Sequence, residues 1–343
     1  MPHMIAIINE TATQDQLDHF VSWIERRGFK TNVSQGASET IVGIIGDTTQ
    51  IDPLLLESLD IVDQVRRVSE PFKKANRKFH PADTVIDCGH GVLVGGGSFQ
   101  VIAGPCSVEG EGLRAIARAV KAAGAGLLRG GAYKPRTSPY SYQGMGERGL
   151  DLLMEVAGEL DLPVVSEVMD PRDVQTFLDK GVDVMQVGAR NSQNFALLRE
   201  VGKTKVPVLL KRGSGLMIDE LLMAAEYVMS EGNPNVMLCE RGIRTFETRT
   251  RNTFDVNAIP VLHRLSHLPV IGDPSHATGH ARYVRPIAYA AVAAGADGLE
   301  VEVHDHPSEA WSDGAQALTP RQFADAMRRI ALVREAVRAD EEG

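Results

Sequence analysis

Residues 163–213 read PVVSEVMDPRDVQTFLDKGVDVMQVGARNSQNFALLREVGKTKVPVLLKRG, and this stretch repeats one pattern. Three apolar runs are typical of buried strands, at residues 164–165, 184–187 and 206–210. The segments between them, 171–180 and 192–202, carry apolar side chains at helical spacing, and Gly181 fits the position that ends a helix. Strands that alternate with helices of this size predict a parallel sheet.

The same alternation continues on both sides of this stretch. Eight apolar runs are predicted strands, at residues 101–103, 126–128, 164–165, 184–187, 206–210, 236–238, 269–271 and 299–303. Eight segments with helical spacing follow them, at 112–123, 147–160, 171–180, 192–202, 218–230, 257–266, 280–294 and 320–338. Eight strand-helix units favour closure into a (β/α)₈ TIM barrel over an open doubly wound sheet.

The 343 residues exceed the roughly 250 of a plain barrel, so the start of the chain predicts a separate small domain. Its predicted strands and helices follow the order β-α-β-β-α-β, at 4–8, 13–27, 31–34, 40–46, 52–58 and 62–68. This order is that of the ferredoxin-like arrangement. We expect a ferredoxin-like domain over 1–70, a linker and hairpin over 71–97, and the barrel over 98–338. The glycines at 95–97 lack G-x-G-x-x-G spacing and are interpreted as a turn.

Composition and charge exclude several classes of partner. A net charge of −9 argues against nucleic acid and against an anionic membrane surface, since both attract basic proteins. The three cysteines cannot form a disulfide framework, and the first residues lack a signal-peptide pattern, so we expect a cytoplasmic protein. The apolar stretches fall short of the ~20 residues that a membrane-spanning helix needs.

Four potential metal ligands lie at or just beyond predicted strand ends: Cys106, His276, Glu302 and Asp313. The carboxyl ends of all barrel strands converge on one face, so residues this far apart in sequence can line one pocket. A thiolate, an imidazole and two carboxylates suit a divalent transition metal, with zinc, iron, manganese and cobalt all open. Taken singly, Cys106 could instead be a small buried residue, and His276 could instead be a hydrogen-bonded histidine without a metal.

Seven basic residues follow the predicted second, fourth, fifth and sixth strands: Arg129, Lys134, Arg136, Arg190, Lys211, Arg212 and Arg241. In an acidic protein this cluster indicates bound anions, and its size indicates more than one anionic group. Surface ion pairs are the alternative for any single member. Glu167 is predicted either to orient a cation or a water or to form an ion pair at the rim.

Three further residues near the last predicted strand have open roles. His304 and His306 could form a second metal pair with Glu302, although solvated loop histidines are the simpler explanation. Glu300 lies two residues before Glu302, so strand alternation turns both side chains into the barrel. A carboxylate buried there requires a partner or a proton.

These residues lie in motifs that make the chain resemble the 3-deoxy-D-arabino-heptulosonate 7-phosphate (DAHP) synthases. The motifs are AGPCSVEG around Cys106, LRGGAYKPRTSPYSYQG from Leu128, QVGARN around Arg190, LLKRG at Lys211, ERG at Arg241, GDPSH ending at His276, EVEVH around Glu302 and SDGAQAL from Ser312. The first domain looks like the regulatory domain of this family's short-barrel branch. The resemblance therefore covers nearly the whole chain. It departs from the family pattern at Glu300, His280 and Arg282.

The resemblance implies condensation of phosphoenolpyruvate with erythrose 4-phosphate, the first step of the shikimate pathway. It implies that Cys106, His276, Glu302 and Asp313 hold a divalent metal. Phosphoenolpyruvate would be held by Arg129, Lys134, Arg190, Lys211 and Arg241 with the backbone of Gly188 and Ala189. Erythrose 4-phosphate would be held by Lys134, Arg136, Thr137 and Ser138. Catalytic roles are expected for Lys134, Glu167 and His276.

The resemblance also bears on the assembly of the protein and on its regulation. The resemblance implies a homotetramer and a first domain that senses tyrosine or phenylalanine, so that deletion of residues 1–75 would abolish inhibition. A 3-deoxy-D-manno-octulosonate 8-phosphate synthase, which uses arabinose 5-phosphate, is the nearest alternative enzyme. The KPRTS segment from Lys134 and the first domain argue against it. A non-catalytic amino-acid sensor with a relict barrel is the alternative from another class.

Overall fold

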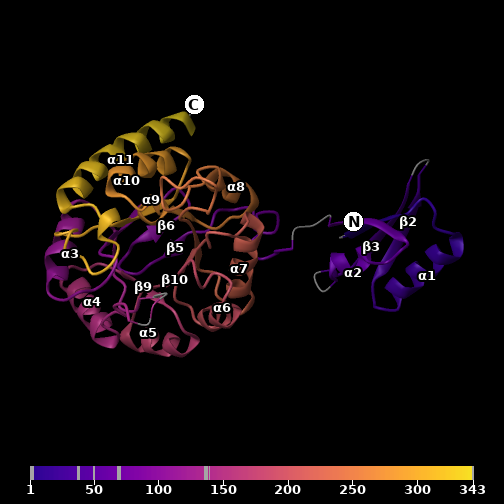
Figure 1. Ribbon diagram of the computed structural model, residues 1–343, viewed down its shortest axis with the longest axis horizontal. Helices are drawn as coiled ribbons and strands as arrows, with labels where there is room; N and C mark the ends of the chain where they lie inside the picture. Colours follow the sequence, from indigo (N-terminus) through magenta and orange to yellow (C-terminus); the bar gives the residue numbers. More distant parts are fainter. Residues whose placement is uncertain are drawn as a thin grey trace. The chain divides into compact units, whose positions relative to one another are not determined.

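The computed structural model describes residues 4–36, 39–48, 51–67, 71–134, 138 and 140–341. The chain divides into two compact units, residues 1–73 and 74–343. Each unit has its own hydrophobic core. Figure 1 shows the two units as ribbons. Within the described residues, no helix has both the length and the apolar composition needed to cross a bilayer.

The first unit is a four-stranded antiparallel sheet with two helices. Its elements are β1 Met4–Ile8, α1 Gln14–Glu25, β2 Lys30–Gln35, β3 Thr40–Ile45, α2 Pro53–Glu57 and β4 Val62–Arg67. The strand order β2-β3-β1-β4 is ferredoxin-like, as predicted. Thr13 and Gln16 form a capping box that starts α1, and this helix packs Leu17, Phe20 and Ile24 into the core.

The second unit is a closed barrel of eight parallel strands, which confirms the predicted fold. The strands are β7 Gln100–Gly104, β8 Leu127–Arg129, β9 Val164–Val168, β10 Val184–Val187, β11 Val208–Lys211, β12 Val236–Glu240, β13 Val270–Gly272 and β14 Gly298–Glu302. In chain order each strand pairs with the next, and β14 pairs with β7. Their residues are almost all buried because helices cover the outside and side chains fill the inside.

Helices form the outer ring of the barrel (Figure 1). The ring consists of α3 Gly112–Ala122, α4 Glu147–Glu159, α5 Val174–Lys180, α6 Phe195–Gly202, α7 Ile218–Ser230, α8 Ala258–Leu265, α10 Ala281–Ala293 and α11 Pro320–Glu341. The short helix α9 Pro274–Thr278 and the 3₁₀ turns η2 Pro171–Asp173 and η3 Gly314–Gln316 lie in the connections between strands and these helices. Sequence periodicity predicts all of the α-helices except α9, which at five residues is too short to show a period.

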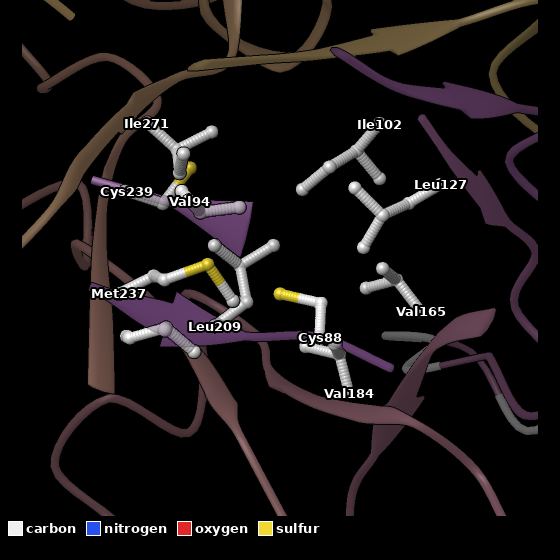
Figure 2. Packing of buried hydrophobic residues seen from close by; sticks show 11 residues of the cluster. Cys88, Val94, Ile102, Leu127, Val165, Val184, Leu209, Met237, Cys239 and Ile271 are labelled. Atoms are coloured by element: carbon white, nitrogen blue, oxygen red, sulfur yellow. The ribbon is translucent and has the colours of Figure 1, made fainter. Parts of the chain in front are cut away.

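A hairpin precedes the barrel, as expected. Strands β5 Ile86–Asp87 and β6 Leu93–Val94 pair antiparallel. Figure 2 shows Cys88 and Val94 of this hairpin among inward-facing side chains of the barrel strands, including Leu209 and Met237. The hairpin lies at the amino-terminal end of the barrel, because the segment around it contacts residues that precede barrel strands. Thr84 N–H donates to the carbonyl of His267, which precedes β13.

Candidate active site

A cavity of about 400 Å³ lies at the carboxyl ends of the strands, where the sequence analysis places the candidate residues. Every strand or the loop that follows it contributes, which is how barrels of this class form a site. The cavity is lined by Cys106, Arg129, Lys134, Glu167, Gln186, Gly188, Ala189, Arg190, Lys211, Ser214, Arg241, Arg244, Arg251, Asn252, His276 and Asp313. Its lining is therefore largely cationic.

The four predicted metal ligands form one cluster. Ligand atoms of Cys106, His276, Glu302 and Asp313 all lie within 4.8 Å of one another. Cys106 Sγ is 3.3 Å from Asp313 Oδ2, and His276 Nε2 is 3.1 Å from Glu302 Oε1. The spacing and the donor chemistry fit a divalent transition metal with mixed S, N and O ligands.

The protonation of two of these ligands follows from their surroundings. Burial and the nearby Glu302 raise the pKa of the Cys106 thiol to about 12, so the thiol keeps its proton and donates to Asp313. Although burial opposes ionisation, Arg251 and His276 lower the pKa of Asp313 to about 2. A metal that binds through Cys106 must therefore displace a proton.

A second layer of side chains fixes each ligand. Asp273 accepts from His276 Nδ1 at 2.7 Å, which leaves Nε2 facing the cluster. Gln316 donates to Glu302 Oε2 at 2.7 Å, Ser312 Oγ lies 3.2 Å from Cys106 Sγ, and Arg251 donates to Asp313 Oδ1 at 3.2 Å. Partners of this kind orient ligands and set their tautomer in metal sites.

The GDPSH segment explains how His276 is held. Asp273 caps α9 by accepting from the backbone N–H of His276 at 2.9 Å, and Pro274 occupies the first helical position. The same carboxylate also receives the Lys211 ammonium at 2.5 Å. One buried aspartate therefore positions both a metal ligand and a cation of the cavity.

The cations of the cavity fall into two groups. Arg129 and Lys211 form ion pairs with buried carboxylates. Although burial opposes protonation, these carboxylates raise the pKa of both groups above their ordinary values. In contrast, Arg190, Arg241 and Arg244 have no carboxylate within 4.0 Å among the described residues. Burial lowers the pKa of Arg241, and a buried guanidinium without a counter-ion indicates an anion site.

Two residues that the sequence analysis singles out lie at the edge of this cavity. Lys134 is buried and donates to the Cys106 carbonyl at 2.9 Å and to its Sγ at 3.0 Å. Glu167 lines the cavity beside Gly188, where a Cβ would lie 1.9 Å from Glu167 Oε1. The glycine of the QVGAR motif therefore leaves space for the Glu167 carboxylate.

Four further residues named in the sequence analysis have different outcomes. Arg136 and Thr137 lie outside the described residues. Ser138 is exposed and is not among the residues that line the cavity. Arg212 turns away from the cavity to pair with Glu240 and Asp255 at 2.8 and 2.9 Å, so its assignment to the anion site is wrong.

The suggested second metal pair beside Glu302 finds no support among the described residues. His304 pairs with Glu109 and Asp305 at 3.5 and 3.2 Å, and neither His304 nor His306 lies in a cluster with metal-ligand spacing.

The sequence analysis missed several side chains of the cavity. Arg244, Arg251 and Asn252 come from the loop after β12, whose ends pair at Ile243 and Thr253. Their signal is the run IRTFETRTRN directly after ERG, in which basic residues follow a strand end. Gln316 and Asp273 carry no such signal, because their contacts depend on tertiary packing.

Comparison with known families settles the class of the protein. Residues 77–337 match the model of the DAHP synthetase I family, and residues 4–70 match the DAHP synthase ferredoxin-like domain. The chain belongs to the DAHP synthetase I family. It is therefore a member of an enzyme family, and its closed barrel with a ferredoxin-like domain matches the architecture of a solved DAHP synthase.

Individual relatives agree with this membership of the DAHP synthetase I family. Phospho-2-dehydro-3-deoxyheptonate aldolase of Thermotoga maritima is 45% identical over 97% of this chain and 98% of the relative. The crystal structure of that DAHP synthase has a TM-score of 0.93 and covers 98% of both chains. A 2-dehydro-3-deoxyphosphooctonate aldolase of Syntrophobacter fumaroxidans is 33% identical over 72% of this chain and 91% of the relative.

Proposed function

We propose that the enzyme condenses phosphoenolpyruvate with erythrose 4-phosphate to give DAHP and inorganic phosphate, the first step of the shikimate pathway. The observation that carries the proposal is the position of the cluster of Cys106, His276, Glu302 and Asp313. This cluster shares one cavity with Arg190, Arg241 and Arg244, which have no carboxylate partner among the described residues. A reaction between a phosphorylated enol and a phosphorylated aldehyde needs both an electrophile activator and several anion sites. Membership of the DAHP synthetase I family supports the same reaction.

The four clustered ligands would hold a divalent metal such as manganese, iron, zinc or cobalt. When bound, it supplies Lewis-acid polarisation of the aldehyde oxygen. Asp273 keeps the Nε2 atom of His276 free to bind, since it accepts the Nδ1 proton. Because the Cys106 thiol is protonated before binding, its proton must leave as the ligand set forms.

The cations would hold phosphoenolpyruvate. Arg190 and Arg241, with Arg129, Lys211 and the backbone of Gly188 and Ala189, surround the part of the cavity in which its phosphate and carboxylate would lie. The C3 carbon then attacks the aldehyde carbon of erythrose 4-phosphate, water adds at C2, and the C–O bond to phosphate breaks. The arginines stabilise the charge that develops on the leaving phosphate.

Two residues are proposed to move or position protons. Lys134, whose ammonium lies 3.0 Å from Cys106 Sγ, would donate a proton to the oxygen formed from the aldehyde. Glu167, near the end of β9 and in the lining of the cavity, would orient the attacking water. Arg136, Thr137 and Ser138 of the KPRTS segment remain the proposed contacts for erythrose 4-phosphate.

The octulosonate alternative would use the same barrel and the same phosphoenolpyruvate chemistry. The similarity to the heptonate aldolase includes the first domain, whereas the octulosonate relatives match about 70% of the chain. This difference in coverage favours erythrose 4-phosphate over arabinose 5-phosphate as the second substrate.

We further propose that the first domain regulates the barrel by binding tyrosine or phenylalanine, and that the protein is a homotetramer. The match of residues 4–70 to the DAHP synthase ferredoxin-like domain supports this role. Light scattering of the purified protein measures the tetramer directly.

The reaction is tested by phosphate release from phosphoenolpyruvate. Erythrose 4-phosphate and arabinose 5-phosphate are compared, each with EDTA and after restoring a divalent metal. Turnover with erythrose 4-phosphate alone, lost on chelation and regained with metal, is expected. Turnover only with arabinose 5-phosphate would assign the octulosonate reaction instead. Inactivity of folded, metal-loaded protein with both aldehydes would favour an amino-acid sensor.

A further inference from the structure

Glu300 is a charged residue in a layer of the barrel that is otherwise apolar. The other seven strands contribute inward-facing apolar side chains to one cluster, which includes Ile102 of β7 and Leu127 of β8. Strand β14 places Glu300 in register with Ile102, and its side chain is only 1% exposed. A carboxylate at this depth requires a compensating charge.

Two cations of the cavity provide that charge. Glu300 Oε2 is 2.8 Å from Lys211 Nζ, and Glu300 Oε1 is 3.2 Å from Arg129 Nη1. Within the part of the chain that the structure describes, neither carboxylate oxygen accepts a hydrogen bond of ordinary geometry, so the ion pairs with Lys211 and Arg129 hold this side chain. Lys211 and Arg129 both line the cavity in which the substrate anions are expected.

Glu300 also belongs to a cluster of three side chains that could be mistaken for a second metal site. Ligand atoms of Cys239, Asp273 and Glu300 lie within 4.8 Å of one another. However, the Lys211 ammonium is 2.5 Å from Asp273 and 2.8 Å from Glu300. The cation of this group is therefore Lys211 itself, which is fixed in position by two carboxylates.

The charges around the floor of the cavity show what Glu300 changes. Arg129 and Lys211 are together in contact with three carboxylates, those of Asp273, Glu300 and Glu302. These two cations are therefore already compensated before a substrate arrives, whereas no described carboxylate lies within 4.0 Å of Arg190 or Arg241. An anionic substrate that reaches Lys211 must share it with Glu300.

We propose that Glu300 is a resident counter-ion, a positioning residue that holds Lys211 and Arg129 in place in the free enzyme and weakens the binding of phosphoenolpyruvate. This inference rests on the proposed function for the identity of the substrate. The effect of Glu300 on anion binding does not depend on the proposed function, since any small anion in this cavity experiences the same charge.

The direction of the effect follows from two arguments. Removing a fixed negative charge close to the anion site strengthens anion binding directly. It also leaves Lys211 and Arg129 undercompensated in the free protein, and a bound anion restores that compensation. Both effects make the anion bind more tightly to a variant without the charge and make that variant less stable without a ligand.

The test is Glu300→Gln, which keeps the size of the side chain and removes its charge. Calorimetric titration with phosphoenolpyruvate, and separately with inorganic phosphate, is carried out in EDTA without aldehyde so that no turnover occurs. We expect the dissociation constant for phosphoenolpyruvate to fall by at least about tenfold, since two unit charges about 8 Å apart at an effective dielectric constant near 20 already interact by more than the free energy of one tenfold change. The melting temperature without ligand should fall, and saturating phosphoenolpyruvate should reduce that difference.

Glu240→Gln is the matched control. Glu240 is also fully buried and ion-paired, but its partner Arg212 does not line the cavity. This variant should lose stability with a much smaller gain in anion binding, since the Glu240 carboxylate forms its ion pair with Arg212, which does not line the cavity. Glu300→Asp, which keeps the charge, should bind phosphoenolpyruvate as weakly as the wild type.

Three results would overturn the proposal: unchanged affinity in Glu300→Gln, weaker affinity in that variant, or an equal gain in the Glu240→Gln control. If Glu300→Gln does not fold, Glu300→Met gives the same comparison with an apolar side chain of similar size. Wild-type turnover tests the proposed function separately. If wild type is inactive while Glu300→Gln still binds inorganic phosphate more tightly, only the identity of the substrate is wrong.

Discussion

Asp273 makes a sharp test of the site, because one carboxylate serves both the metal ligands and the cation cluster. Its Oδ2 accepts from His276 Nδ1 at 2.7 Å and from Lys211 Nζ at 2.5 Å, while Oδ1 caps the backbone N–H of His276 at 2.9 Å. In Asp273→Asn an amide nitrogen must replace one of these oxygens. Every partner at these positions is a donor, so the new NH₂ group meets a donor in either orientation of the amide.

The favourable orientation of the new amide keeps its oxygen on the helix cap and turns its NH₂ group toward His276 Nδ1. The imidazole then accepts at Nδ1 and carries its proton on Nε2, the atom that faces the ligand cluster. Loss of such a supporting partner weakens metal binding about 10- to 100-fold, or about 1.4 to 2.7 kcal/mol. We expect Asp273→Asn to fall in this range.

The metal affinity of Asp273→Asn is measured by competition for Zn²⁺ or Mn²⁺ against a chromophoric chelator at constant pH. Asp255→Asn is the control, since Asp255 pairs with Arg212 away from the cavity. Its metal affinity should match that of wild type. A dissociation constant for Asp273→Asn within about twofold of wild type would refute the tautomer argument. Turnover of Asp273→Asn at saturating metal should recover only in part, because Lys211 has also lost a partner.

Three further predictions concern separate parts of the chain. Lys134→Ala should lower turnover by at least about 100-fold with phosphoenolpyruvate still bound, and near-normal turnover would remove Lys134 from catalysis. Burial holds the pKa of His267 below its ordinary value, so the unfolded chain binds its proton more readily and stability falls as the pH drops below about 6.5. His267→Gln should therefore show a smaller loss of melting temperature between about pH 7.5 and about pH 5.5, and an unchanged loss would contradict this assignment. Deletion of residues 1–73 removes the first unit and keeps the hydrogen bonds from the backbone of Lys74 and Ala75 to Glu226. The shortened protein should keep its turnover and lose inhibition by tyrosine or phenylalanine. Inhibition that survives the deletion would place the effector site in the barrel.

The sequence predicts the strands and the long helices of both units because their apolar residues follow a clear period. It also predicts the cluster of Cys106, His276, Glu302 and Asp313, since the carboxyl ends of barrel strands converge. Arg212 shows the limit of this argument. It directly follows Lys211, the last residue of β11, yet the alternation of side chains turns it away from the cavity to Glu240.

The supporting contacts could not be predicted from sequence. Arg251 reaches Asp313 across 62 positions, and Gln316 reaches Glu302 from a 3₁₀ turn. Both contacts depend on how a long loop folds back, which no local pattern encodes. For Glu300 the sequence predicts an inward direction and the need for a partner, but only the packed barrel identifies Lys211 and Arg129 as its partners.

The hairpin of β5 and β6 determines how molecules reach the site. Its apolar side chains fill the barrel from the amino-terminal end, so the reaction cavity opens toward the carboxyl-terminal loops. Two substrates must then enter, and two products must leave, along one path. A ligand held by buried groups such as Lys211 and Arg129 has to bind before a ligand held nearer the rim. Once the outer ligand is bound, it covers the inner one. With the proposed substrates, the closed end of the barrel imposes an order on binding, with phosphoenolpyruvate first and the sugar phosphate second.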